Sequence, residues 1–202
     1  MVLCHGCEGS RAWGFFPHLA ERLARAGLAT VSFDFSGAGE EGRISSAPDR
    51  FAPDRYRREL RELEVVLDAV TRGALGIRPP RVGLLGHGTG GSIAILRTAA
   101  DPGVRALVTW AAAARLGTTL DVLTAAAEVR VPWLIVHGAA DESVPPDAAE
   151  ELYRVARRGT AEKLLLGGAG HSFGAAHPWA GSSTALDQAV SATVAWFSRH
   201  LA

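Results

Sequence analysis

The sequence predicts an α/β protein, with a mostly parallel sheet of about six strands and helices on both faces. Short apolar runs alternate along the chain with longer segments in which apolar residues recur every three to four positions. Regular alternation of strands and helices is typical of a parallel sheet covered on both sides. The chain has 202 residues, 48% hydrophobic and 21% charged, which is enough for a single domain, 1–202, with a sizeable core.

The elements follow one another with clear boundaries. The first strand leads into a glycine-rich turn, and the helix after it is closed by Gly27. A polar segment from Asp34 to Pro53 forms a long loop, and a loop of that length in a compact domain is often functional. Strands are expected over 2–4, 28–33, 81–86, 106–111, 133–137 and 162–166, and helices over 13–26, 54–71, 92–100, 119–127, 147–157 and 184–201.

Charge and hydropathy argue against several kinds of partner. The formal net charge is +0, whereas proteins that bind nucleic acids carry a basic face. No apolar run reaches the ~18 residues of a membrane span, and no signal peptide precedes the first strand, so we expect a cytoplasmic protein without a membrane partner. Cys4 and Cys7 form a C-x-x-C pair, but no second pair exists, so a structural role is preferred over a redox or zinc site.

Glycines crowd into the turn that follows the predicted strand 81–86. The outer glycines of the nucleophile elbow, G-x-S-x-G, are matched by Gly86 and Gly90, but the central position is Gly88 rather than serine. Gly86, Gly88 and Gly91 also match the dinucleotide-binding pattern G-x-G-x-x-G. This second interpretation fits poorly, because the turn follows the third strand and the next strand ends without the acid that would bind a ribose.

Four further motifs stand at the carboxyl ends of predicted strands, where the functional residues of such sheets gather. They are His5-Gly6, the segment from Phe33 to Glu40, the segment from His137 to Pro145 that contains Asp141, and Gly168–His171. A turn, then an acid, then a histidine resembles the order of the triad positions in the α/β-hydrolase superfamily. The resemblance spans nearly the whole chain and is closest to small bacterial serine hydrolases related to dienelactone hydrolases and acyl-peptidase catalytic domains.

The resemblance implies a role for each motif. Asp141 would orient His171, which would act as the base, and the backbone N–H groups of Cys7 and Thr89 would form the oxyanion hole. The side chains expected to bind substrate are His87, Trp110 and Phe173. The implied substrate is a small-molecule acyl compound or ester, and neither a cofactor nor a metal is expected.

Gly88 departs from the family pattern, because glycine has no side chain with which to attack a substrate. Four explanations are open: the protein has lost its nucleophile and binds a ligand or partner, the glycine was introduced in place of a natural nucleophile, another side chain attacks, or Asp141 and His171 activate a water. Cys7 is the preferred substitute nucleophile, since a thiol near a histidine can be activated, and Thr89 and Ser36 are weaker candidates.

The surroundings of the site complete the prediction. The short segment between Trp110 and Val131 predicts little or no lid, and the charges of the helix 54–71 are expected to form a solvated face. The leading antiparallel strands usual in the superfamily are missing, so the first strand is expected at an open sheet edge, which favours a homodimer. The predicted function is acyl or carboxylic-ester hydrolysis, weak or altered with Gly88, and the alternative is a non-catalytic binding protein.

Overall fold

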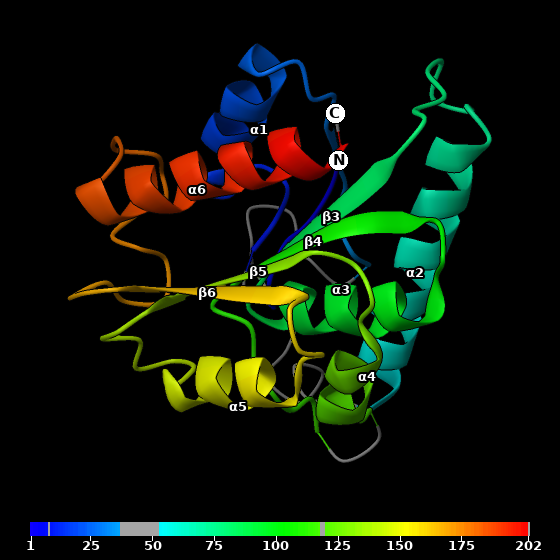
Figure 1. The fold of residues 1–202 in the computed structure, drawn as a ribbon. Coiled ribbons are helices and arrows are strands. Elements are labelled where there is room, and N and C mark those ends of the chain that lie inside the picture. The colour runs from blue at the N-terminus through cyan, green and yellow to red at the C-terminus, as the bar shows by residue number, and fades with distance from the viewer. Residues whose placement is uncertain (8, 37–52, 118–119, 202) are drawn as a thin grey trace.

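A six-stranded parallel sheet forms the centre of the molecule (Figure 1). The computed structural model describes residues 1–7, 9–36, 53–117 and 120–201. The strand order is β2-β1-β3-β4-β5-β6. The strands are β1 (Val2–Cys4), β2 (Val31–Ser32), β3 (Val82–His87), β4 (Val104–Trp110), β5 (Trp133–Gly138) and β6 (Ala161–Leu166). The predicted fold class is therefore confirmed.

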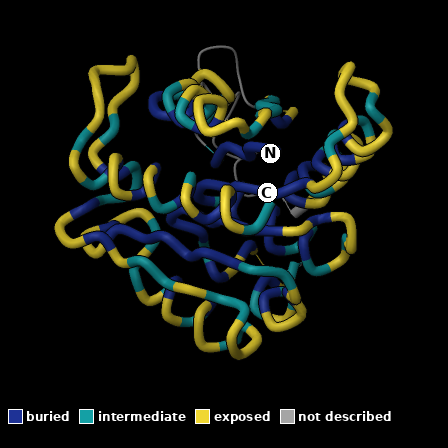
Figure 2. Tube along the Cα trace, turned by 45° about the horizontal axis from the view of Figure 1, so that its top comes forward, coloured by how far each residue is buried: buried dark blue, intermediate teal, exposed yellow. Residues whose placement is uncertain are grey.

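Helices cover both faces of this sheet (Figure 1). One face carries α1 (Phe16–Arg25) and α6 (Thr184–Leu201), and the other carries α2 (Pro53–Thr71), α3 (Thr89–Ala100), α4 (Val122–Glu128) and α5 (Asp147–Val155). Consecutive strand residues point to opposite faces, so Leu84 and Leu85 of β3 enter two different hydrophobic cores. The strands β1, β3, β4 and β5 are accordingly mostly buried at the centre of the molecule, and most exposed residues lie on the helices and loops around them, whereas β6 at the sheet edge is partly exposed (Figure 2).

The register of the sheet aligns the carboxyl ends of its central strands. Cys4 pairs with Gly86, His87 pairs with Trp110, and Trp110 pairs with Val136. The segments that follow β1, β3, β4 and β5 therefore leave the sheet along a single edge. In open parallel sheets this is the edge at which ligands bind.

Several element boundaries differ from those predicted. α3 begins at Thr89, three residues before its expected start, because its glycines serve packing inside a helix rather than a turn. A Cβ on Gly90 would lie only 2.2 Å from the carbonyl oxygen of His5. β2 is limited to two residues of the expected 28–33, and α1 begins at Phe16, with Pro17 in its first turn, rather than at Trp13.

Two expectations about the periphery have different outcomes. β1 lies between β2 and β3, so the expectation that the first strand forms an open edge is wrong, because β2 pairs on its outer side. The helix α4 packs against α3 and α5, so the described part of the segment between β4 and β5 covers a face of the sheet and forms no lid.

Parts of two predicted elements lie outside the described residues. These are positions 37–52 of the long loop 34–53 and position 119 of the helix expected over 119–127. Within the residues that the structure describes, no helix is both long enough and apolar enough to cross a membrane.

Candidate active site

Asp141 and His171 meet at the carboxyl edge of the sheet, although each belongs to a different loop. Asp141 follows β5, and His171 follows the neighbouring strand β6. The Nδ1 atom of His171 lies 2.8 Å from Oδ2 of Asp141, which is a hydrogen-bonding distance. The carboxylate is fully buried, whereas the His171 side chain is 27% exposed. A buried carboxylate thus orients an imidazole that is open to solvent, which is the arrangement of an oriented general base.

Asp141 is held by the turn that it begins and by a buried histidine. Its Oδ1 accepts the backbone N–H groups of Ser143 and Val144, both at 2.9 Å. The Nε2 atom of His137 lies 2.9 Å from the carbonyl oxygen of Val144 and 3.4 Å from Oδ2 of Asp141. Burial lowers the pKa of His137, so the ring is neutral. Its Nδ1 has no hydrogen-bond partner among the described residues, so the proton belongs on Nε2, which donates to Val144.

Gly88 occupies the elbow between β3 and α3. Its backbone angles are φ 55° and ψ −125°, which residues with a Cβ rarely adopt. A Cβ built on Gly88 would lie 3.3 Å from Nε2 of His171 and 3.8 Å from Cα of Gly6. The position therefore faces the Nε2 edge of the imidazole, between His171 and the loop that follows β1. The protein keeps the backbone geometry of a nucleophile elbow but has no side chain there.

His87 contacts the backbone of the His171 loop and holds it in place. Its Nε2 lies 3.0 Å from the carbonyl oxygen of His171, and the centroids of the two rings are 4.6 Å apart. Burial lowers the pKa of His87 to about 3, so the ring is neutral and its Nε2–H donates to that carbonyl. Phe15 packs edge-on against the ring, with the centroids 5.2 Å apart. His87 consequently helps to hold the His171 loop in place.

Trp110 and Phe173, two of the side chains expected to bind substrate, are buried in this structure. Both side chains are 0% exposed, and His87 is only 6% exposed. The Trp110 indole N–H donates to Oγ1 of Thr193 on α6 at 2.9 Å, and its ring lies 5.4 Å from that of Phe173. Because α1 and α6 cover this face of the sheet, the three side chains form the packed floor of the site and offer little or no surface to a ligand.

The two residues predicted to supply oxyanion-hole amides are next in the chain to the Gly88 position and to its neighbour Gly6. Thr89 is the first residue of α3, and the first N–H groups of a helix have no partner within it. Cys7 follows Gly6, which lies next to the Gly88 position on its other side. Two N–H donors that point to one spot beside an imidazole can bind the oxyanion of an acyl-transfer intermediate, so the role of these two amides stays a prediction.

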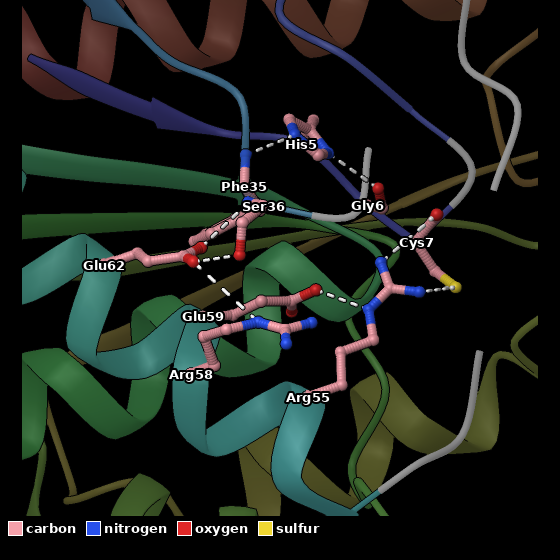
Figure 3. Close-up of polar contacts among 9 residues, drawn as sticks. All are labelled: His5, Gly6, Cys7, Phe35, Ser36, Arg55, Arg58, Glu59 and Glu62. Atoms are coloured by element: carbon pink, nitrogen blue, oxygen red, sulfur yellow. Dashed lines mark hydrogen bonds and ion pairs between the residues drawn. The ribbon is translucent and has the colours of Figure 1, made fainter. Parts of the chain in front are cut away.

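The Cys7 side chain lies against α2 (Figure 3). Nη1 of Arg55 lies 3.5 Å from its Sγ, and Nη2 lies 3.4 Å from its carbonyl oxygen. Cys4 is fully buried, and burial raises the pKa of its thiol. The two cysteines of the C-x-x-C pair thus have separate surroundings, one in the core and one beside a guanidinium.

Two charged residues of α2 were missed as parts of the site. The helix was expected to place its charges in solvent, but Arg55 and Glu59 are 4% and 2% exposed. The sequence does contain a signal for their burial, because Arg55 and Glu59 share the four-residue spacing of the buried Leu63 and Leu67 on the same helix. Ser36, the weakest candidate nucleophile, donates its hydroxyl and its backbone N–H to the Glu62 carboxylate (Figure 3).

Comparison with known proteins agrees with this fold. The sheet order, the elbow and the strand-end residues define an α/β hydrolase. The model of the family described as "Serine aminopeptidase, S33" matches residues 1–120, and the chain belongs to that hydrolase family. No curated protein matches the chain.

Solved structures share the fold at low sequence identity. A dienelactone hydrolase from Anabaena variabilis is similar with a TM-score of 0.80 and 24% identity, covering 100% of this chain and 86% of that chain. Est1E from Butyrivibrio proteoclasticus has a TM-score of 0.75 and 18% identity over 97% of this chain and 85% of its own. A monoacylglycerol lipase from Paleococcus ferrophilus has a TM-score of 0.75 and 16% identity over 98% and 93%, respectively. At such identities the likeness establishes the fold.

Proposed function

We propose that this protein is a single-domain hydrolase of small acyl compounds or carboxylic esters, in which Asp141 and His171 activate a water molecule. The observation that carries the proposal is the position of His171, whose Nδ1 is 2.8 Å from Asp141 and whose Nε2 faces the Gly88 elbow. The similar structures include a dienelactone hydrolase and a monoacylglycerol lipase, and their names support a carboxylic-ester substrate.

The proposed reaction is a single displacement. Nε2 of His171 takes a proton from a water held in the space beside Gly88, and the resulting hydroxide adds to the ester carbonyl. The N–H groups of Cys7 and Thr89 stabilise the oxyanion. When the tetrahedral intermediate collapses, the alkoxide leaves and takes the proton from His171, which releases the carboxylic acid and the alcohol. No acyl-enzyme forms, because Gly88 has no side chain to acylate.

This activity should be slow. Removing the nucleophile of a triad typically leaves a rate about 10³–10⁴ above that of water, supplied by the oxyanion hole and substrate binding. The site therefore predicts measurable but weak turnover of activated esters, in which Asp141→Asn lowers kcat at least about 10-fold because the histidine loses its orientation.

Short p-nitrophenyl esters provide the test. Turnover by the protein and by Asp141→Asn is measured together with the intact mass of the protein during the reaction. The proposal expects turnover that depends on Asp141, with no mass increase corresponding to an acyl group. A Cys7→Ala variant keeps the backbone N–H and should still hydrolyse the ester in an Asp141-dependent way. Complete loss of activity in that variant, together with an acyl adduct on the unaltered protein, would identify the thiol as the nucleophile and overturn the water mechanism.

A binding function is the second candidate, and the backbone of Gly88 favours it. The φ of 55° is unstrained for glycine, so loss of the nucleophile is compatible with a stable elbow and a retained pocket. This alternative expects a carboxylic-acid product or ester analogue to bind, detected by calorimetry, with turnover equal to the uncatalysed rate in both the protein and Asp141→Asn.

A further inference from the structure

A buried ion pair lies beside the site and has no part in the proposed reaction. Nε of Arg55 donates to Oε1 of Glu59 at 2.6 Å, and the side chains are 4% and 2% exposed. Burial raises the pKa of the Glu59 carboxyl, while the bond from the guanidinium lowers it. Buried ion pairs contribute little net stability, because the desolvation of both charges offsets their attraction. The pair therefore calls for an explanation other than stability.

The guanidinium uses each of its nitrogens on a defined acceptor. Nε contacts Glu59, Nη1 contacts Sγ of Cys7, and Nη2 contacts the carbonyl oxygen of Cys7 (Figure 3). Glu59 thus fixes the guanidinium from the helix side, and the planar group holds Cys7 at two atoms. Arginine suits this task because its donors stand in a rigid, planar fork.

Hydrogen bonds also fix the peptide between Gly6 and Cys7, which precedes Cys7 in the chain. The backbone N–H of Phe35 donates to Nε2 of His5 at 3.0 Å, so the proton of the neutral ring is on Nδ1. Nδ1–H then donates to the carbonyl oxygen of Gly6 at 2.8 Å, and the N–H of Gly9 donates to the same oxygen at 3.0 Å. Because the C=O and N–H of a trans peptide point in opposite directions, these bonds also direct the N–H of Cys7.

From these contacts we infer that Arg55, held by Glu59, is a positioning residue that fixes the Cys7 backbone as an oxyanion-hole donor. His5 orients the peptide before Cys7, and Arg55 holds the carbonyl after it, so both peptide planes that flank the residue are constrained. The inference rests on the proposed function for the role of the Cys7 N–H, whereas the rigidity of the loop can be measured without any substrate.

A matched pair of double variants separates positioning from stability. Arg55→Met/Glu59→Leu removes both buried charges together, so that no unpaired charge remains in the core. The control is Asp68→Leu/Arg72→Met, which replaces an exposed acid–arginine pair at the carboxyl end of α2, where Arg72 follows the last helical residue and the contact distance is 2.9 Å. Hydrogen exchange followed by mass spectrometry reports on residues 5–9 and, as an internal reference, on β3 and α3.

The inference predicts a local change. In Arg55→Met/Glu59→Leu, amide exchange in residues 5–9 becomes about 10-fold faster, while exchange in β3 and α3 and the thermal midpoint stay close to those of the unmodified protein. For turnover of p-nitrophenyl esters, kcat falls about 10-fold or more with little change in KM, because an oxyanion donor acts in the transition state. The control double variant changes neither the amide exchange in residues 5–9 nor kcat.

Other outcomes distinguish the two claims. A folded Arg55→Met/Glu59→Leu protein with unchanged exchange in residues 5–9 would overturn the inference. Faster exchange there without turnover in any variant would uphold the positioning of Cys7 and contradict the hydrolase. If the double variant does not fold, Arg55→Lys replaces it: a single ammonium keeps the ion pair but cannot hold Glu59 and both Cys7 atoms, so faster loop exchange supports the inference and unchanged exchange overturns it.

Discussion

A Cβ on Gly88 would lie 3.3 Å from the Nε2 atom of His171. The other nitrogen of that ring is bonded to Asp141 at 2.8 Å. The His171 ring therefore lies between the Asp141 carboxylate and position 88, which has no side chain. The relationship is specific to this edge of the sheet, because it joins the ends of β3, β5 and β6, and it determines how the site should respond to substitution.

Restoring the hydroxyl should restore nucleophilic catalysis. Gly88→Ser places an Oγ within reach of His171, so ester hydrolysis should rise at least about 100-fold and an acyl-enzyme should become detectable by mass spectrometry. Gly88→Ala, which adds the Cβ without a hydroxyl, is the matched control and should show no gain. A Gly88→Ser protein that is folded but no faster would mean that Gly88 is not the nucleophile position.

The same substitution should destabilise the protein. A residue with a Cβ at φ 55° and ψ −125° is strained by about 1–3 kcal/mol, and its Cβ would press on the His171 ring. Chemical denaturation of Gly88→Ala and Gly88→Ser should both show a free energy of unfolding lower by that amount. Equal stability of all three proteins would show that the elbow relaxes around the new side chain.

Gly90 should tolerate no side chain at all. A Cβ there would lie 2.2 Å from the carbonyl oxygen of His5, and backbone cannot move aside as a flexible side chain can. Gly90→Ala should cost more than about 3 kcal/mol of unfolding free energy, or prevent folding. Gly167→Ala is the control, because its Cβ would meet nothing within 4 Å. A thermal midpoint unchanged in Gly90→Ala would refute the close approach of α3 to the loop after β1.

The buried histidines predict a loss of stability in acid. Burial lowers the pKa of His87 from 6.5 to about 3, so between these pH values the unfolded chain binds a proton that the folded protein does not. The contribution is complete above pH 6.5 and is lost as the pH falls, by about 2 kcal/mol at pH 5 for this ring. Denaturation across pH 8 to 4 should show a shallower loss for His87→Gln, and an identical slope would show that His87 titrates normally.

His137 should matter through one donated hydrogen bond. His137→Phe keeps a buried ring but leaves the Val144 carbonyl without its donor, which should cost about 1–3 kcal/mol of unfolding free energy and lower ester turnover by disturbing Asp141. His137→Gln retains an N–H near the position of Nε2 and should recover most of both quantities. If the phenylalanine and glutamine variants behave alike, the bond to Val144 has no role in holding Asp141.

The sequence predicts the edge of the sheet well, because its signals there are local. Each of Asp141 and His171 follows a short apolar run, and parallel strands end at the same edge, so their proximity follows from topology alone. The elbow at Gly88 is likewise visible as crowded glycines between a strand and a helix. The bounds of α6 also match, since its apolar periodicity is uninterrupted.

What depends on distant packing could not be predicted. Trp110 was expected near substrate, yet its N–H bonds to Thr193, 83 residues away, beneath α6. The four-residue spacing that Arg55 and Glu59 share with the apolar face of α2 indicates burial, but it does not indicate that Cys7, in the loop after β1, is what Arg55 contacts. In both cases the partner is set by how helices dock on the sheet, which a pattern within one helix or strand does not encode.

The rate of p-nitrophenyl acetate hydrolysis by the unaltered protein and by His171→Ala, measured side by side at pH 8, tests the central claim most directly. If the Asp141–His171 pair activates a water beside Gly88, the protein exceeds the uncatalysed rate and His171→Ala falls back to it while remaining folded. Equal rates for the two proteins above that background would contradict the account.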